Sequence, residues 1–168
     1  MPSNSLAPKP RSIGTRRTIS IVASLYNDEL VNSLLNSTIE ELRRIMPSIT
    51  VPVYRVPGAF EIPVCVKHLI ENNTNDALIA LGVIIKGETD HADLVGSSVT
   101  TSLQNLALAN NIPIIHEVLL TENREQAVER CQGAKNRGLE AAKAAITMAE
   151  LFSSLNAIKD RRTSTSNG

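Results

Sequence analysis

Aromatic residues and cysteines are scarce in this chain of 168 residues, which contains no tryptophan, two tyrosines, two phenylalanines and two cysteines. With so few aromatics, we expect each one to occupy a specific place, although packing in the core is the default explanation. Cys65 and Cys131 lie far apart and lack CxxC or metal-ligand spacing. The cysteines therefore indicate reduced thiols in a cytoplasmic protein, and we expect no metal site.

The sequence also lacks a surplus of charge, because its 17 basic residues balance its 17 acidic ones. Its isoelectric point is about 6.8, whereas nucleic-acid-binding domains usually carry a basic surplus on one face. The longest apolar run, residues 77–85, is far too short to cross a bilayer, and the N-terminal stretch has no apolar signal-peptide core. We therefore expect neither a nucleic-acid partner nor a membrane partner.

Both ends of the chain lack a periodic apolar pattern. Residues 1–17 are rich in serine, proline and basic residues, and residues 156–168 finish with the polar stretch KDRRTSTSNG. Segments of such composition bury too little apolar surface to stay ordered alone. We predict a disordered N-terminal arm over residues 1–17, one domain over residues 18–155 and a disordered C-terminal tail over residues 156–168.

Strand patterns and helix patterns alternate along the domain. Apolar residues at three- and four-residue spacings give residues 28–46 one apolar stripe, as in an amphipathic helix. Residues 77–85 are continuously apolar, as expected for a parallel strand covered on both faces. Pro52 indicates an edge position or a bulge for its strand. The predicted strands are residues 18–24, 49–56, 77–85 and 112–120, and the predicted helices are residues 28–46, 60–72, 92–110, 123–131 and 135–155.

This order of elements predicts an α/β fold. Right-handed crossovers produce a four-stranded parallel sheet with helices on both faces, which is a doubly wound three-layer sandwich. Ligands of such folds bind beyond the carboxyl ends of the strands. Loops with polar or aromatic residues follow the first three predicted strands, at residues 25–28, 56–61 and 86–91. Three such loops in succession favour a binding site over chance placement.

The third loop combines two kinds of chemistry. Its turn, from Gly87 to Thr89, leads from a strand into a helix, so backbone N–H groups and the helix dipole suit an anion such as phosphate. His91 follows the turn, and an imidazole both accepts and donates protons at neutral pH. His91 is therefore the best catalytic candidate, and the alternative is a surface histidine in the first turn of a helix.

Several stretches resemble the lumazine synthase family. They are VPGAFEIP at residues 56–63, ALGVIIKGETDHADLV at residues 80–95, ENREQAVER at residues 122–130 and NRG at residues 136–138. The resemblance implies a flavodoxin-like fold and the penultimate step of riboflavin biosynthesis. In that step 5-amino-6-(D-ribitylamino)uracil condenses with 3,4-dihydroxy-2-butanone 4-phosphate to 6,7-dimethyl-8-ribityllumazine, phosphate and water. It also implies that no metal and no organic cofactor is needed.

The resemblance assigns a role to each candidate site residue. It makes His91 the proton shuttle of the reaction. It assigns phosphate binding to the backbone of Glu88, to Thr89 and to Arg130. The residues that it assigns to the pyrimidine and its ribityl chain are Tyr26, Asn27, Ala59, Phe60, Glu61, Val83, Ile84, Ile85 and His116.

Three of these residues have simpler explanations when the sequence is taken alone. A tyrosine at the end of a strand, such as Tyr26, is a packing residue about as often as a stacking one. Glu61 suits the first turn of a helix because an acid there interacts favourably with the helix dipole. Arg130 on a helix is more often solvated than bound to a ligand. The resemblance raises the functional explanation in each case.

The chain departs from the family pattern at a few positions. His116 stands where the family commonly carries phenylalanine facing the site of a neighbouring subunit, although a lone histidine at a strand end is more often structural. Lys86 replaces the usual arginine, which keeps the charge but loses the fork of donors. The segment after Arg130 is shorter than in many relatives, so the roles of Lys135 and Arg137 stay open.

By analogy with the family, the chain forms a homo-oligomer in which adjacent subunits of a pentamer build each active site. Some members pack pentamers into icosahedral shells, and riboflavin synthase is a candidate partner. The sequence leaves the pentamer and the larger assemblies open. It also leaves three rival functions: a shell or ligand-storage relative without catalysis, a flavodoxin-like signalling domain, and an enzyme that dismutates lumazine into riboflavin on a similar scaffold.

Overall fold

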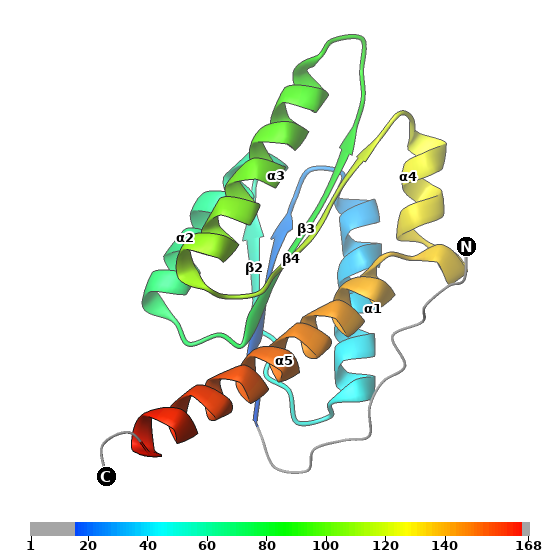
Figure 1. Cartoon of the computed structure of the whole chain (residues 1–168). Coiled ribbons are helices and arrows are strands. Elements are labelled where there is room, and N and C mark those ends of the chain that lie inside the picture. The colour runs from blue at the N-terminus through cyan, green and yellow to red at the C-terminus, as the bar shows by residue number, and fades with distance from the viewer. Residues whose placement is uncertain (1–15, 166–168) are drawn as a thin grey trace, which may run out of the picture.

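A single parallel sheet forms the centre of the molecule (Figure 1). The computed structural model describes residues 16–165. The sheet has four strands in the order β2-β1-β3-β4. The strands are β1 (Ile19–Ser24), β2 (Val53–Val56), β3 (Ala77–Ile85) and β4 (Ile114–Thr121), and the α-helices are α1 (Asp28–Ile45), α2 (Ile62–Asn72), α3 (His91–Asn110), α4 (Arg124–Cys131) and α5 (Gly138–Thr165). The predicted α/β fold with a four-stranded parallel sheet is confirmed.

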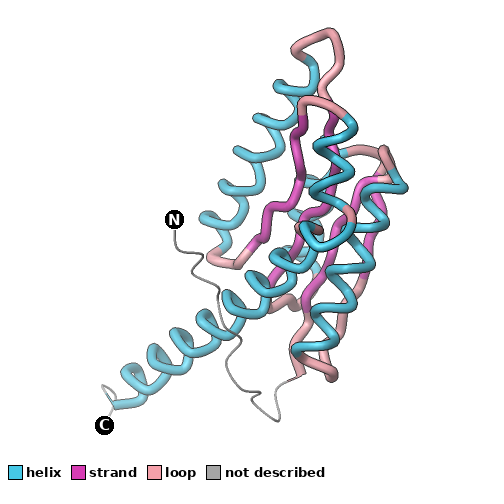
Figure 2. Tube along the Cα trace, turned by 90° about the vertical axis from the view of Figure 1, so that its right-hand side faces the viewer, coloured by secondary structure: helices cyan, strands magenta, loops and turns pink. Residues whose placement is uncertain are grey.

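Helices cover both faces of the sheet, which makes three layers (Figures 1 and 2). Buried side chains of α1, α4 and α5 pack on one face in one core cluster, and those of α2 and α3 pack on the other face in a second cluster. The central strand β3 serves both, because Ile79 and Leu81 belong to the first cluster and Leu78 and Ala80 to the second. Burial on both faces explains why this strand is continuously apolar.

The second strand lies at the edge of the sheet, as Pro52 indicates. It begins at Val53, later than predicted, and the chain before it touches the sheet through an isolated bridge between Thr18 and Thr50. Proline has no N–H to donate to a ladder, but the Pro52 carbonyl still accepts a hydrogen bond from the Ile21 N–H at 2.9 Å. The edge strand is therefore short for a local chemical reason.

Helices α2 and α5 begin later than the sequence predicts, each after a 3₁₀ turn. A 3₁₀ turn, Ala59–Glu61, precedes α2, and a second one, Gly133–Lys135, precedes α5. Helix α5 then starts at Gly138, where the chain passes so close to α1 that an added Cβ would collide with the Leu34 carbonyl oxygen. Only glycine fits this close approach, so the start of α5 is set by packing against α1 rather than by the preceding residues.

The ends of the domain extend beyond the predicted boundaries. Arg17, which was assigned to the disordered arm, is buried, and its guanidinium donates to the Asp76 carboxylate at 3.3 Å. Helix α5 continues through residues 156–165, so the prediction of a disordered tail from residue 156 is wrong for them. The rest of the predicted arm and tail, residues 1–15 and 166–168, lies outside the described residues.

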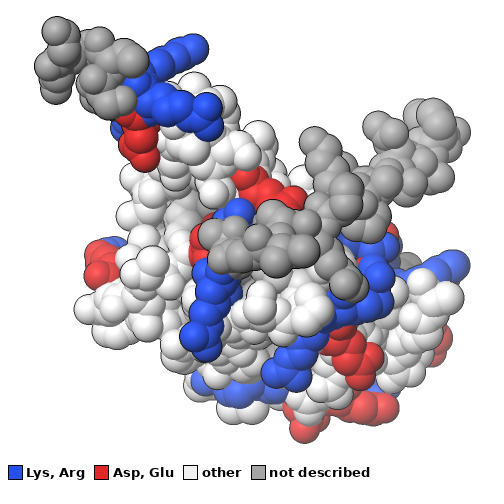
Figure 3. All heavy atoms as spheres, turned by 90° about the horizontal axis from the view of Figure 1, so that it is seen from below, with Lys and Arg blue, Asp and Glu red and all other residues white. Residues whose placement is uncertain are grey.

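The surface carries charges of both signs. On the face seen in Figure 3, lysine and arginine side chains are interspersed with aspartate and glutamate. This distribution agrees with the equal numbers of basic and acidic residues in the sequence. Among residues 16–165, we find no helix that combines the length and the apolar character needed to span a bilayer.

Candidate active site

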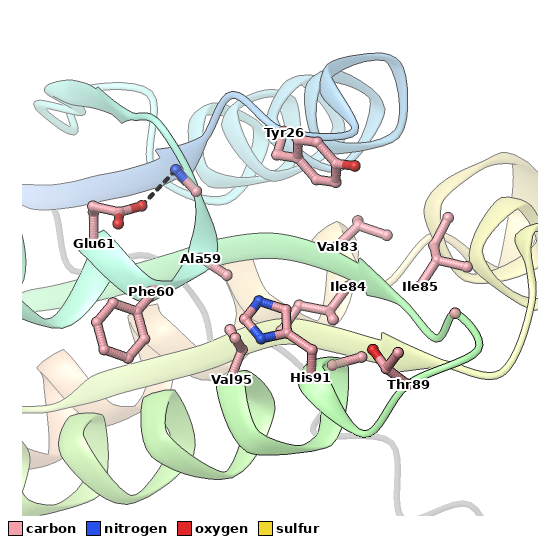
Figure 4. A pocket seen from close by; sticks show the side chains of 13 residues that line it. Tyr26, Ala59, Phe60, Glu61, Val83, Ile84, Ile85, Thr89, His91 and Val95 are labelled. Atoms are coloured by element: carbon pink, nitrogen blue, oxygen red, sulfur yellow. Dashed lines mark hydrogen bonds between the residues drawn. The ribbon is translucent and has the colours of Figure 1, made fainter.

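The three predicted loops meet at the carboxyl edge of the sheet and enclose a pocket of about 350 Å³ (Figure 4). This volume lies within the range of pockets that bind small molecules. Residues from the loop after β1, the 3₁₀ turn before α2, the end of β3 and the start of α3 converge on it. The pocket is lined by Tyr26, Gly58, Ala59, Phe60, Glu61, Val83, Ile84, Ile85, Gly87, Thr89, His91, Ala92 and Val95.

The first loop is fixed by backbone hydrogen bonds to the second. The N–H groups of Leu25 and Tyr26 donate to the carbonyls of Val56 and Pro57 at 2.8 and 3.0 Å. These bonds hold the backbone of Tyr26, while its side chain is 74% exposed at the rim of the pocket. An aromatic ring held in this way offers a π-face to a flat ligand.

Asn27 joins the first loop to the central strand. Its backbone is left-handed, with φ of 56°, and its side-chain amide donates to the Val83 carbonyl at 2.8 Å. Asparagine tolerates this conformation better than most residues. Asn27 was expected to contact the pyrimidine or ribityl chain, but its side chain is bound to the protein and does not line the pocket.

The second loop is organised by Glu61. The Gly58 N–H donates to Glu61 Oε2 at 2.8 Å, which is the dashed line in Figure 4. This bond closes the 3₁₀ turn that presents Ala59 and Phe60 to the pocket. The Glu61 carboxylate therefore has a structural partner, in agreement with the helix-start explanation, and it also lies in the pocket wall.

The third loop brings His91 into the pocket at the start of α3. Figure 4 shows the imidazole projecting from the helix toward Ala59 and Ile84. Gly87 and Thr89 line the same wall, so the turn and the first residue of α3 face one space. The first N–H groups of an α-helix lack partners within the helix and favour negative charge. The turn that was expected to bind an anion and the histidine that was expected to carry protons therefore line the same pocket.

Most of the predicted site residues come together here. Like Asn27, the residues Glu88, His116 and Arg130 do not line the pocket. His116 lies on β4, where its Nε2 is 2.9 Å from the Thr100 hydroxyl, and desolvation lowers the pKa of its imidazole. Arg130 is exposed in the last turn of α4. Those that line the pocket are Tyr26, Ala59, Phe60, Glu61, Val83, Ile84, Ile85, Thr89 and His91.

The sequence did not point to three of the lining residues, Gly58, Ala92 and Val95, and it named Gly87 only as part of the anion-binding turn. Gly58 and Gly87 belong to the predicted loops, but glycine has no side-chain group that would indicate a ligand contact. Ala92 and Val95 lie on α3 next to His91 and one turn beyond it, so helical periodicity would have found Val95. Within the described range, no three histidine, cysteine, aspartate or glutamate side chains are grouped so that they could hold a metal ion.

Comparisons with known proteins identify the family of this chain. A family model described as 6,7-dimethyl-8-ribityllumazine synthase matches residues 16–153. The protein of that name from Burkholderia multivorans is 40% identical over 153 residues, which cover 90% of this chain and 87% of the relative. Those from Burkholderia mallei and Burkholderia pseudomallei are 39% identical with the same coverage. The chain therefore belongs to the 6,7-dimethyl-8-ribityllumazine synthase family of enzymes.

Proposed function

We propose that this enzyme condenses 5-amino-6-(D-ribitylamino)uracil with 3,4-dihydroxy-2-butanone 4-phosphate to form 6,7-dimethyl-8-ribityllumazine, phosphate and water. One observation carries the proposal: a single pocket combines a stacking aromatic, a proton carrier and a helix-start turn suited to phosphate. The two substrates need these three features, because one is a flat heteroaromatic diamine and the other is a phosphorylated ketone.

The pyrimidine and its ribityl chain occupy the side of the pocket formed by the first two loops. The Tyr26 ring stacks on the heterocycle, since its backbone is fixed and its face is exposed. The Glu61 carboxylate accepts from ribityl hydroxyls with the lone pairs that Gly58 leaves free. Backbone groups at the end of β3, from Val83 to Ile85, supply hydrogen bonds to the ring edge.

The phosphate of the second substrate binds at the turn before α3. Backbone N–H groups from Gly87 to Thr89 and the Thr89 hydroxyl suit its oxygens. Glu88 contributes only its backbone N–H. Its side chain is exposed and does not line the pocket, so its carboxylate does not repel the bound phosphate. We assign the second cationic contact to Arg130, whose planar guanidinium suits phosphate oxygens.

His91 moves the protons. The pyrimidine 5-amino group attacks the ketone carbonyl, and loss of water leaves an imine. His91 removes a proton from the carbon next to the imine as phosphate departs from its neighbour. It then returns a proton as the enol becomes a ketone, which the ribitylamine nitrogen attacks to close the ring with loss of water. Proton transfer of this kind contributes about 10²–10⁴-fold, so positioning of the substrates supplies much of the remaining acceleration.

The active enzyme is a homo-oligomer, and we propose a pentamer in which His116 and Arg130 serve the pocket of a neighbouring copy. Two features support this. Neither residue lines the pocket of its own chain, and α3 presents Leu94 and Leu108 to solvent at 68% and 70% exposure. Large apolar side chains at such exposure favour a covered surface. The free thiols of Cys65 and Cys131 are in keeping with a cytoplasmic enzyme.

Two measurements test the proposal. The first incubates the purified protein with both substrates and follows lumazine formation by absorbance and fluorescence above the uncatalysed rate. No acceleration by a folded oligomer would exclude the synthase activity and leave a binding or shell role. The second mixes the impaired variants His91→Ala and Arg130→Ala after dissociation and reassembly. Sites shared between copies should regain about a quarter of the activity at equal mixing, whereas sites within one copy should regain none.

A further inference from the structure

Lys86 immediately precedes the phosphate turn but takes no part in lining the pocket. Its neighbours Ile85 and Gly87 both line the pocket, whereas Lys86 does not. Its ammonium instead lies 3.1 Å from Asp93 Oδ1 and 2.8 Å from Glu122 Oε1. We call these three side chains the Lys86 cluster. Lys86 is therefore directed toward carboxylates of the protein and not toward a ligand.

The Lys86 cluster brackets the catalytic segment. Lys86 immediately precedes the turn, and Asp93 lies in the first turn of α3, so their ion pair closes a loop that contains Gly87, Thr89 and His91. Glu122 belongs to the connection between β4 and α4, which adds an external anchor. This connection is itself held, because the Glu122 N–H donates to the Gln126 side chain at 3.0 Å. The ion pairs therefore link the two ends of the segment 86–93 to each other and to the connection between β4 and α4.

We propose that Lys86 is a positioning residue whose ion pairs with Asp93 and Glu122 hold the phosphate turn and His91 in the geometry for proton transfer. The inference rests on the proposed function, because it assigns His91 the proton-transfer role. It deepens that function by identifying what orients the third loop. Among the described residues, no side chain of residues 87–91 makes a hydrogen bond like those of Asn27 and Glu61, so Lys86 provides the only side-chain anchor of this described loop.

The chemistry of the cluster agrees with this role. Hydrogen bonds to Glu122 and then to Asp93 raise the pKa of Lys86, so the cation persists across the physiological range. The side chains of Lys86, Asp93 and Glu122 are 28%, 50% and 64% exposed. Exposed ion pairs contribute little to stability and are screened by salt. Loss of the cluster should therefore change turnover while leaving global stability almost unchanged.

The test compares Lys86→Met, Lys86→Arg and Lys67→Met. Lys67→Met is the matched control, since it removes an exposed ion pair with Glu71 on α2, away from the pocket. At saturating substrates, we expect kcat of Lys86→Met to fall about three- to tenfold, with the melting temperature unchanged. Lys86→Arg should retain most of the turnover, and the control should match the parent enzyme. Raising salt should lower kcat of the parent about twofold and leave Lys86→Met unaffected.

A second readout does not depend on catalysis. Hydrogen–deuterium exchange of the backbone amides of residues 87–92 should be faster in Lys86→Met than in the parent or the control. If the parent enzyme shows no synthase activity, the proposed function fails. Faster amide exchange in Lys86→Met would then still support the role of the Lys86 cluster in holding the turn. Unchanged amide exchange in Lys86→Met would overturn the inference. If the parent enzyme is active, the inference would also be overturned if Lys86→Met and Lys86→Arg lowered its turnover equally, or if neither lowered it.

Discussion

The loops on the two sides of the pocket are held by different forces. The first loop is held by neutral hydrogen bonds. The N–H groups of Leu25 and Tyr26 donate to carbonyls at the start of the second loop, and the Asn27 amide donates to the Val83 carbonyl of β3. The third loop is bracketed by the exposed charges of the Lys86 cluster. Partly buried hydrogen bonds are insensitive to salt, whereas exposed ion pairs are screened and exchange readily.

This difference matches the chemistry proposed for each side. The first two loops have to present one fixed surface, including the Tyr26 ring, to a rigid heterocycle. Preorganised hydrogen bonds suit that purpose. The third loop has to accept a charged ketone and release inorganic phosphate. Exposed ion pairs suit this loop because they can rearrange as the ligand changes. We therefore expect substitutions in the first two loops to change substrate binding, and substitutions in the third to change turnover.

Replacing the two principal side chains should separate these effects most clearly. His91→Ala should lower kcat by about 10²–10⁴-fold, because general acid–base help is lost while positioning remains. Tyr26→Ala should instead raise KM for the uracil substrate and lower kcat much less. Steady-state kinetics with each substrate varied in turn measures both. A kcat loss in Tyr26→Ala as large as that in His91→Ala would abolish the distinction between the two sides.

Asn27 tests whether the first loop depends on its hydrogen bond. Asn27→Ala loses the bond to Val83 and places alanine, which tolerates left-handed backbone less well than asparagine, at φ of 56°. The two effects together cost about 2 kcal/mol of unfolding free energy. Asn27→Gly keeps the backbone freedom and loses only the bond, so it should cost about 1 kcal/mol. In both variants KM for the uracil substrate should rise, about tenfold in Asn27→Ala.

Urea unfolding and steady-state kinetics provide these values. Equal stability of Asn27→Ala and the parent enzyme would show that the tie to β3 does not fix the first loop. A direct ligand contact of Asn27 would be indicated if Asn27→Gly and Asn27→Ala raised KM equally while stability stayed at the parental value.

Glu61→Gln separates the structural and binding roles of one carboxylate. The glutamine oxygen can still accept from the Gly58 N–H, so the free energy of unfolding should change by less than about 0.5 kcal/mol. The lost charge weakens hydrogen bonds from ribityl hydroxyls, and KM for the uracil substrate should rise about fivefold. Isothermal titration with a ribityl-bearing ligand and with one lacking the chain distinguishes these roles. Equal loss of affinity for both would contradict the ribityl assignment.

The smallest effect is expected from Gly58→Ala. The Gly58 backbone is extended, which alanine adopts readily, and the added Cβ would lie 3.0 Å from Glu61 Oε2. The flexible carboxylate can shift by a few tenths of an ångström, so stability should change by less than about 1 kcal/mol. KM for the uracil substrate should rise about twofold. A loss of turnover at constant KM would show that the second loop also governs the third.

The sequence predicted the fold and most of the residues that line the candidate pocket, because the relevant signals were local. The bounds of β3 were predicted correctly, since burial on both faces makes a strand continuously apolar. The tie from Asn27 to Val83 was not predicted, because the two residues are remote in sequence. The end of α5 was also misjudged, since its last turns are helical without the apolar pattern that packing requires.

Helix α5 ends as a projecting arm with little support from the domain (Figure 2). At 1.5 Å per residue its 28 residues span about 42 Å. In the described part of the chain, Ala149 is its last side chain in the core, and Leu151, Leu155 and Ile158 are exposed. Short helices without packing are marginal in water, so this arm should melt before the domain. Heating the single chain should therefore give a gradual loss of far-UV ellipticity ahead of the cooperative transition.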